Sequence, residues 1–199
     1  MAALAALLAM IAVVTAGYSG ERPAAVTSSV SVLSPTLTAA PGVGAGVHLA
    51  RSVPVRLQIA AIGVDTALMN LGLKADGTME VPPRGFPAGW YTGAPTPGEL
   101  GPAIIAGHVD MNGPGVFYDL RKVKPGSRVT VTRKDGSTPV FRVTRVQQFP
   151  KDQFPTKAVY GDIDHAGLRL ITCGGPFNRQ SGHYEDNVVA FADLLAPAR

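Results

Sequence analysis

Short stretches in which apolar and polar residues alternate, separated by turn-forming pairs, dominate this chain from Val53 onward. Residues 128–133 and 140–146 both alternate, and they flank the turn sequence Lys-Asp-Gly-Ser at residues 134–137. Period-two alternation predicts strands with one buried face, and an Asp-Gly pair between two such strands predicts a hairpin. Glycine (23 residues) and proline (17 residues) are frequent, which disfavours long helices. The chain is therefore constrained to fold mainly as β-sheet.

The other predicted strands follow the same rules, and a second Asp-Gly pair lies at residues 76–77. They cover residues 55–59, 67–73, 79–81, 103–106, 168–172 and 187–192. Short helices are predicted near residues 115–120 and 154–159. Seven or eight short strands with glycine and proline turns predict a mainly β fold, a closed or nearly closed antiparallel barrel with one or two short helices.

The N-terminal quarter predicts a membrane-directed segment followed by a tether. Residues 1–18 are almost entirely apolar, and no charge precedes Glu21. This segment is short for a spanning helix and lacks the basic residues that precede a signal-peptide core, so a cleaved export signal and an uncleaved anchor both stay open. Residues 19–52 are rich in Ser, Thr, Ala, Pro and Gly, as in flexible linkers. We expect residues 53–199 to form the folded domain, at the extracellular face of the membrane or secreted.

Composition and charge exclude several classes of protein. The apolar fraction of 46% suffices for one core and argues against wholesale disorder. The net charge is only +4 and the basic residues are scattered, so no nucleic-acid partner is predicted. The histidines and acidic residues lack the paired spacing of metal sites, and no glycine-rich phosphate loop precedes a helix. We expect no metal and no other cofactor.

Cys173 is the only cysteine of the chain, so it cannot form an internal disulfide. A lone cysteine is by default a buried apolar residue. This one ends a predicted strand and is followed by Gly174 and Gly175, which allow another backbone to approach closely. Its position at a strand end favours an accessible thiol, which becomes a nucleophile when a base or a positive charge lowers its pKa.

His108 is the partner that we expect for this thiol. It follows Gly107 at the end of the apolar strand predicted at residues 103–106. Two strand ends of one small barrel can meet at the same rim, although the sequence alone does not bring them together. His183, ten residues after Cys173, is the chief alternative.

A thiol that attacks an acyl group also needs a donor for the oxyanion that develops. Arginine suits this role because it is always charged and presents several N–H donors. Arg179 follows Cys173 by six residues, and Arg169 precedes it by four on the same strand face. Backbone N–H groups from Thr172 to Gly174 could supply a further donor. The residues alone leave the two arginines as alternatives.

These residues resemble a known family. Leu170-Ile171-Thr172-Cys173 is similar to the segment that ends the cysteine-bearing strand of sortases, and Ala106-Gly107-His108 is similar to their histidine segment. The order of histidine and cysteine and the apolar N-terminal segment also match. The resemblance covers roughly residues 53–196. Residues 107–110, 173–175 and 182–187 most resemble the class F sortases of high-GC Gram-positive bacteria.

The resemblance implies an eight-stranded sortase barrel that cleaves a C-terminal Leu-Pro-x-Thr-Gly-like sorting signal between Thr and Gly. It implies that Cys173 forms a thioacyl intermediate, that His108 is the general acid and base, and that Thr172 helps to shape the substrate and oxyanion site. The implied partners are surface proteins with a sorting signal, an amine of a cell-wall precursor, and the membrane through the N-terminal segment.

One departure concerns the catalytic arginine of the family, which commonly lies on the last strand. Residues 184–189 contain no arginine. We expect Arg179 to take this role, with Arg169 as the second candidate.

Two other functions remain as alternatives. An L,D-transpeptidase-like wall enzyme is one, although its cysteine would follow Ser-His-Gly rather than the Ile171-Thr172 pair found here. A non-catalytic β-domain that binds the cell envelope, with a buried Cys173, is the other.

Overall fold

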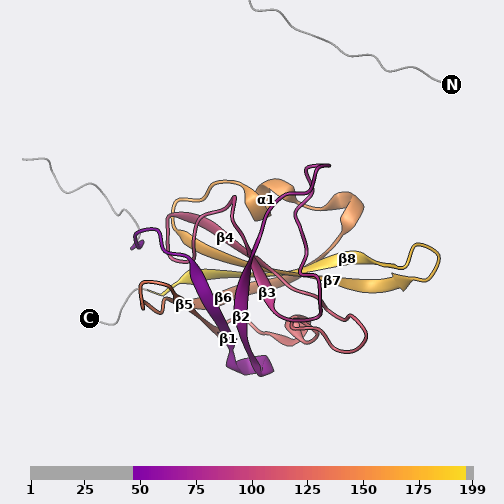
Figure 1. The fold of residues 1–199 in the computed structure, drawn as a ribbon, viewed down its shortest axis with the longest axis horizontal. Coiled ribbons are helices and arrows are strands. Elements are labelled where there is room, and N and C mark those ends of the chain that lie inside the picture. The colour runs from indigo at the N-terminus through magenta and orange to yellow at the C-terminus, as the bar shows by residue number, and fades with distance from the viewer. Residues whose placement is uncertain (1–46, 196–199) are drawn as a thin grey trace, which may run out of the picture. The chain divides into compact units, whose positions relative to one another are not determined.

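The structure, a computed structural model, describes residues 47–195. The predictions for residues 1–18 and for residues 19–46 of the tether lie outside the described residues. Within the described part, eight strands close into one barrel in the order β1-β2-β3-β4-β7-β8-β6-β5 (Figure 1). This confirms the mainly β, closed-barrel prediction. No helix within residues 47–195 is long and apolar enough to cross a membrane.

The described elements are short, except for three long strands in the C-terminal part of the chain. The strands are β1 (Pro54–Ile59), β2 (Val64–Leu71), β3 (Ala88–Tyr91), β4 (Gly101–Ala106), β5 (Arg128–Arg133), β6 (Val140–Pro150), β7 (Ala166–Asn178) and β8 (His183–Leu194). The helices are one turn each: η1 (Ala60–Ile62), η2 (Leu120–Lys122), η3 (Lys151–Gln153) and α1 (Thr156–Tyr160). The helix predicted near residues 154–159 is α1, whereas the one predicted near residues 115–120 is only the 3-10 turn η2.

The two Asp-Gly pairs form turns, but only one of them joins long strands. Arg128 of β5 pairs with Arg142 of β6 across the second turn, and Gly136 there has a φ of 84° that suits glycine. At the first turn, the two sides are joined only by an isolated bridge between Leu73 and Met79. The strand β3 was not predicted, because its four residues Ala-Gly-Trp-Tyr show neither alternation nor a long apolar run.

The prediction of a purely antiparallel barrel is wrong at two places. β2 pairs with β3 in parallel, and β4 pairs with β7 in parallel, while the other neighbours are antiparallel. A parallel pair needs a long crossover connection, which short-range turn signals do not reveal. Between β4 and β7 the crossover contains β5, β6 and α1. As a consequence, the C-terminal ends of β4 and β7 lie at the same end of the barrel.

β4 and the parts of β7 and β8 that lie away from their hairpin are buried on both faces. Toward the inside of the barrel, Leu168 and Leu170 pack with residues such as Phe141 in the main core. On the opposite face, a second cluster packs around α1 and contains Ile104, Val159, Ile171, Val189 and Phe191. Burial on both faces holds this part of the sheet rigid, because core side chains are close-packed.

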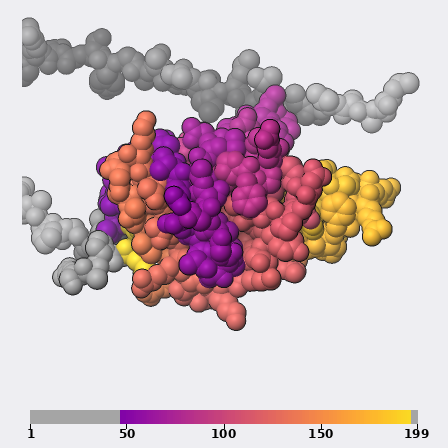
Figure 2. Space-filling view, turned by 60° about the horizontal axis from the view of Figure 1, so that its bottom comes forward, coloured from indigo at the N-terminus to yellow at the C-terminus, as the bar shows by residue number. Residues whose placement is uncertain are grey.

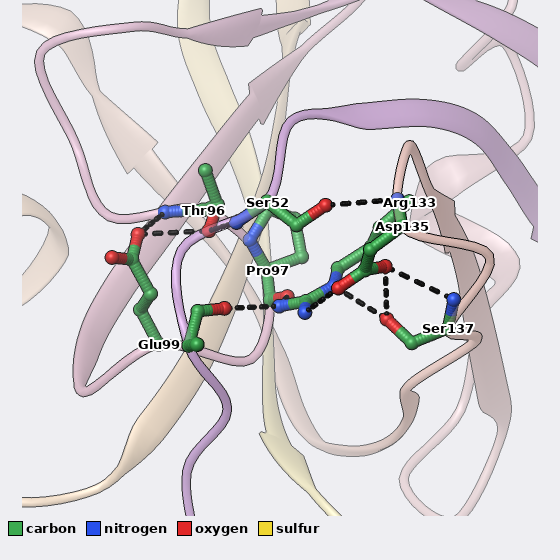
Figure 3. A network of polar contacts seen from close by, with 8 residues as sticks. Ser52, Thr96, Pro97, Glu99, Arg133, Asp135 and Ser137 are labelled. Atoms are coloured by element: carbon green, nitrogen blue, oxygen red, sulfur yellow. Dashed lines mark hydrogen bonds and ion pairs between the residues drawn. The ribbon is translucent and has the colours of Figure 1, made fainter.

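A buried arginine ties the N-terminal side of the described chain to the barrel (Figure 3). The Arg133 side chain is only 2% exposed. Its guanidinium donates to the carbonyl oxygens of Ala50 (3.0 Å) and Pro97 (3.2 Å), and it also donates to Ser137 Oγ (2.8 Å) and Asp135 (2.6 Å). A buried charge is tolerated because the carboxylate and these acceptors compensate for its lost hydration.

Neighbouring polar groups extend this network over residues 47–52. The Ser52 N–H donates to Thr96 Oγ1 (3.1 Å), and the Asp135 N–H donates to Ser52 Oγ (3.1 Å). Thr96 donates through its hydroxyl to Glu99 (2.8 Å). The contacts of the barrel therefore begin upstream of Val53, where the sequence predicted a tether.

Removal of the Arg133 side chain is expected to destabilise the protein. Arg133→Ala leaves the buried Pro97 carbonyl oxygen and the partly buried Ala50 carbonyl oxygen without their donor and breaks the pair with Asp135, which should lower the free energy of unfolding by about 2–4 kcal/mol. Urea unfolding followed by tryptophan fluorescence measures this. Arg142→Ala on the exposed face of β6 is the matched control, and we expect it to change stability by less than about 0.5 kcal/mol. Equal effects of both substitutions would contradict the role of the network.

The same network predicts a stability change in acid. Hydrogen bonds from Ser137 and from the Arg133 guanidinium hold the pKa of Asp135 well below its usual range. A carboxylate with a lowered folded-state pKa stabilises the protein above its unfolded pKa, and this stabilisation is lost as the pH falls. The free energy of unfolding should therefore fall less steeply between about pH 4 and 2 in Asp135→Asn than in the wild type. Parallel slopes in urea titrations at several pH values would refute this.

Candidate active site

The parallel register of β4 and β7 brings His108 and Cys173 to the same end of this ladder. Ala106 is the partner of Ile171 in this ladder, and the Gly107 N–H donates to the Ile171 carbonyl oxygen at 3.0 Å. His108 and Cys173 lie two residues beyond this last pair on their respective chains. Because parallel strands run in the same direction, both residues lie past the same end of this ladder. His108 follows the end of β4, whereas β7 continues to Asn178 and Cys173 pairs with Asn187 of β8, so the prediction that Cys173 ends its strand is wrong.

Cys173 lines a cavity of about 170 Å³ at this end of the barrel. Its side chain is neither fully buried nor fully exposed, so the thiol is accessible to a small reagent. Thr172 and Gly174, the residues on either side of it, line the same cavity. Gly175 also lines the cavity, and its φ of 73° suits glycine. A side chain at this position would collide with the carboxylate of Asp186 on β8.

Backbone contacts fix the position of His108. Its Nε2 lies 2.7 Å from the carbonyl oxygen of Pro82. A carbonyl oxygen can only accept, so Nε2 carries the hydrogen and Nδ1 is left to exchange a proton with another group. The Phe117 N–H donates to the His108 carbonyl oxygen at 2.9 Å. Gly115 allows this approach, because a side chain at that position would collide with the same carbonyl oxygen.

The hydroxyl of Thr172 is unpartnered. Thr172 is 4% exposed, and its Oγ1 is buried without a hydrogen-bond partner. A buried polar atom without a partner costs about 1–3 kcal/mol, so such atoms are rare in folded proteins. Thr172 also lines the cavity beside Cys173, so this buried hydroxyl lies within the cavity wall.

The structure does not bring Arg169 into this cavity. Its side chain is buried on β7, where Nη1 donates to the Leu168 carbonyl oxygen (3.2 Å) and the guanidinium lies 4.8 Å from the ring of Phe191. Both contacts hold the guanidinium toward the start of β7, away from Cys173. Burial lowers the pKa of Arg169, and the nearby Asp193 opposes this effect.

Arg179 is also not among the residues that line the cavity. It is exposed in the turn between β7 and β8, at the tip of a hairpin that projects from the barrel (Figures 1 and 2). His183, the alternative to His108, is exposed at the same turn and pairs with Asn178. The hairpin therefore places Arg179 and His183 at its tip, past the position of Cys173 along β7.

Sequence reasoning did not identify two polar side chains that line the cavity. Tyr184 of β8 donates to Asp110 at 2.5 Å, and this hydrogen bond raises the pKa of Tyr184. Arg121 reaches the cavity from η2. Neither lies next to Cys173 or His108 in the chain, so no local pattern points to them. Among residues 47–195, no three His, Cys, Asp or Glu side chains are grouped so that they could hold a metal ion.

Comparisons with solved structures show which known proteins have this fold. Sortase A from Corynebacterium diphtheriae, a lid mutant, matches with a TM-score of 0.57 and 19% identity over 75% of this chain and 74% of that chain. The sortase D5 transpeptidase of Clostridium perfringens matches with a TM-score of 0.54 and 20% identity over 73% and 79%. Sortase C1 from Streptococcus agalactiae matches with a TM-score of 0.55 and 19% identity over 72% and 68%.

At these identities the likeness concerns the fold alone. Comparison with curated protein sequences gives no significant match. The family model described as the sortase domain, however, matches residues 57–195, which span the barrel from β1 to the end of β8. The chain therefore belongs to the sortase family.

Proposed function

We propose that this protein is a cysteine transpeptidase in which Cys173 is the nucleophile and His108 the general acid and base. The observation that carries the proposal is the parallel register of β4 and β7, which places both residues at one end of the barrel. The half-buried thiol in the cavity and the backbone-held imidazole supply the accessibility and the orientation that nucleophilic catalysis needs.

The reaction follows from these groups. The Cys173 thiolate attacks the carbonyl carbon of a peptide bond, and His108 gives a proton to the departing amine as the C–N bond breaks. The product is a thioacyl enzyme. A second amine then attacks the thioester, gives up its proton to His108, and releases the sulfur. The Thr172 hydroxyl and the backbone at Gly174 contact the acyl group during both steps.

The proposed substrate is a C-terminal Leu-Pro-x-Thr-Gly-like sorting signal on a surface protein, and the proposed acceptor is an amine of a cell-wall precursor. The proposal includes the class F type, which the resemblance of residues 107–110, 173–175 and 182–187 supports. Residues 1–18 would hold the enzyme at the outer face of the membrane or direct its export, and residues 19–52 would form most of the tether.

Replacement of either residue should stop cleavage of a sorting-signal peptide. We expect Cys173→Ala to abolish cleavage and His108→Ala to lower the rate about 100- to 10,000-fold, because it removes general acid and base catalysis. Mass spectrometry of a Leu-Pro-x-Thr-Gly peptide library, with and without glycine peptides as acceptors, measures both. His183→Ala is the matched control and should retain wild-type activity. Cleavage by the Cys173→Ala protein would refute the proposal.

Thiol labelling separates an enzyme from a non-catalytic domain. At neutral pH, iodoacetamide should alkylate Cys173 at least about 10-fold faster in the wild type than in His108→Ala, because a positioned base activates the nucleophile. His183→Ala should keep the wild-type rate. Mass spectrometry of quenched samples gives the rates. Slow labelling that does not depend on His108 would favour a binding domain.

A further inference from the structure

The reaction proposed above creates a negative charge close to Cys173. When the thiolate attacks the acyl carbon, the carbonyl electron pair moves to oxygen, and this oxyanion needs a hydrogen-bond donor. β8, which pairs with β7 beside Cys173, contains no arginine or lysine. Arg169 and Arg179 lie outside the cavity, as described above. A charged donor must therefore come from another element.

Arg121 is the only residue with a permanent charge among the described residues that line the cavity. It belongs to η2, which follows the segment from Val116 to Phe117 that packs against Gly107 and the backbone of His108. The Leu120 side chain is fully buried and fixes η2 in the core, whereas Arg121 is exposed and lines the cavity.

The guanidinium of Arg121 is not engaged elsewhere. Within residues 47–195, no hydrogen bond, ion pair or ring contact involves it. By contrast, the adjacent Lys122 pairs with Asp119 at 2.8 Å, and Lys151 donates to the Tyr184 carbonyl oxygen at 2.6 Å. A cation that lines a cavity without a partner can bind an anion there without breaking an existing contact.

The acidic groups near the cavity already have other partners. Asp110 accepts from the hydroxyl of Tyr184, and Asp186 accepts from Gln148 Nε2 at 2.6 Å. Neither carboxylate is paired with Arg121. The cavity thus combines one unpaired cation with the unpartnered Thr172 hydroxyl on the walls around the thiol.

We infer that Arg121 is a catalytic residue that donates to the oxyanion formed at Cys173, in place of an arginine on β8. This inference rests on the proposed transpeptidase function. The guanidinium stays protonated throughout, so it forms no covalent bond and transfers no proton. It stabilises the oxyanion until the electron pair returns, the C–N bond breaks, and His108 protonates the leaving amine.

Steady-state and single-turnover kinetics with a cleaved sorting peptide test this role. Arg121→Gln should lower kcat and kcat/KM together by about 100- to 1000-fold and leave KM nearly unchanged, because the donor acts only in the transition state. Arg121→Lys should restore part of the rate, since it restores the charge. Lys122→Gln, which removes a charge from the same helix, and Arg179→Gln should retain wild-type rates. Retention of the wild-type rate by Arg121→Gln would overturn the inference.

A second measurement needs no peptide substrate. Iodoacetate is negatively charged and iodoacetamide is neutral, so the ratio of their alkylation rates at Cys173 reports a nearby positive charge. At low ionic strength Arg121→Gln should lower this ratio about fourfold, and 1 M salt should remove most of the difference. Lys122→Gln should change the ratio by less than about 1.5-fold, because the charge it removes is already paired. Thermal melting of each variant confirms that the fold is kept.

The two measurements separate the possible failures. An unchanged alkylation ratio in Arg121→Gln would overturn the inference whether or not the protein cleaves peptides. A lower ratio with an unchanged acylation rate would also overturn it, because the charge would then lie near the thiol without acting on the oxyanion. If the wild type cleaves no sorting peptide although the ratio falls, the proposed function is wrong, and Arg121 remains the anion-binding group of the cavity.

Discussion

The parallel pairing of β4 with β7 is the interaction on which the rest of the site depends. It runs through six residue pairs, from Gly101 with Ala166 to Ala106 with Ile171, and apolar side chains cover it on both faces. A ladder that is buried in this way exchanges no hydrogen bonds with water and resists slippage, since a shift by one residue would reverse every side chain. This register also fixes the positions of His108 and Cys173, because each lies two residues past the last pair of the ladder.

The cavity at these strand ends is chemically distinct from the core beneath it. The core consists of apolar side chains, whereas the cavity is lined by Cys173 and by Arg121, whose guanidinium is unpaired. The unpartnered Thr172 hydroxyl lies within the cavity wall. Such groups lower the stability of the empty protein and gain partners only when a polar acyl group binds. Stability is supplied elsewhere, and the buried Arg133 network at residues 47–52 and the β5–β6 turn is one such contribution.

Much of the fold could be predicted from local patterns. The alternation of residues 128–133 and 140–146 with the turn between them is a short-range signal, and the structure contains that hairpin. β3 and the parallel pairs could not be predicted, because a four-residue strand carries little pattern and crossover connections depend on distant segments. For the site, the sequence indicated Cys173 and His108 as strand-end residues. The structure places His108 just past the end of β4 but Cys173 within β7, and both lie past the same end of the β4–β7 ladder.

The sequence by itself determined the mainly β class, the single thiol with its glycine-rich continuation, and the absence of an arginine from the last strand. These properties depend on residue identity and on neighbours in the chain. Only the tertiary structure decided that Arg169 turns back toward Phe191, that Arg179 lies on a projecting hairpin, and that Arg121 lines the cavity. The physical reason is that a side chain's surroundings depend on strand pairing and crossover connections, which bring together residues that are far apart in the sequence.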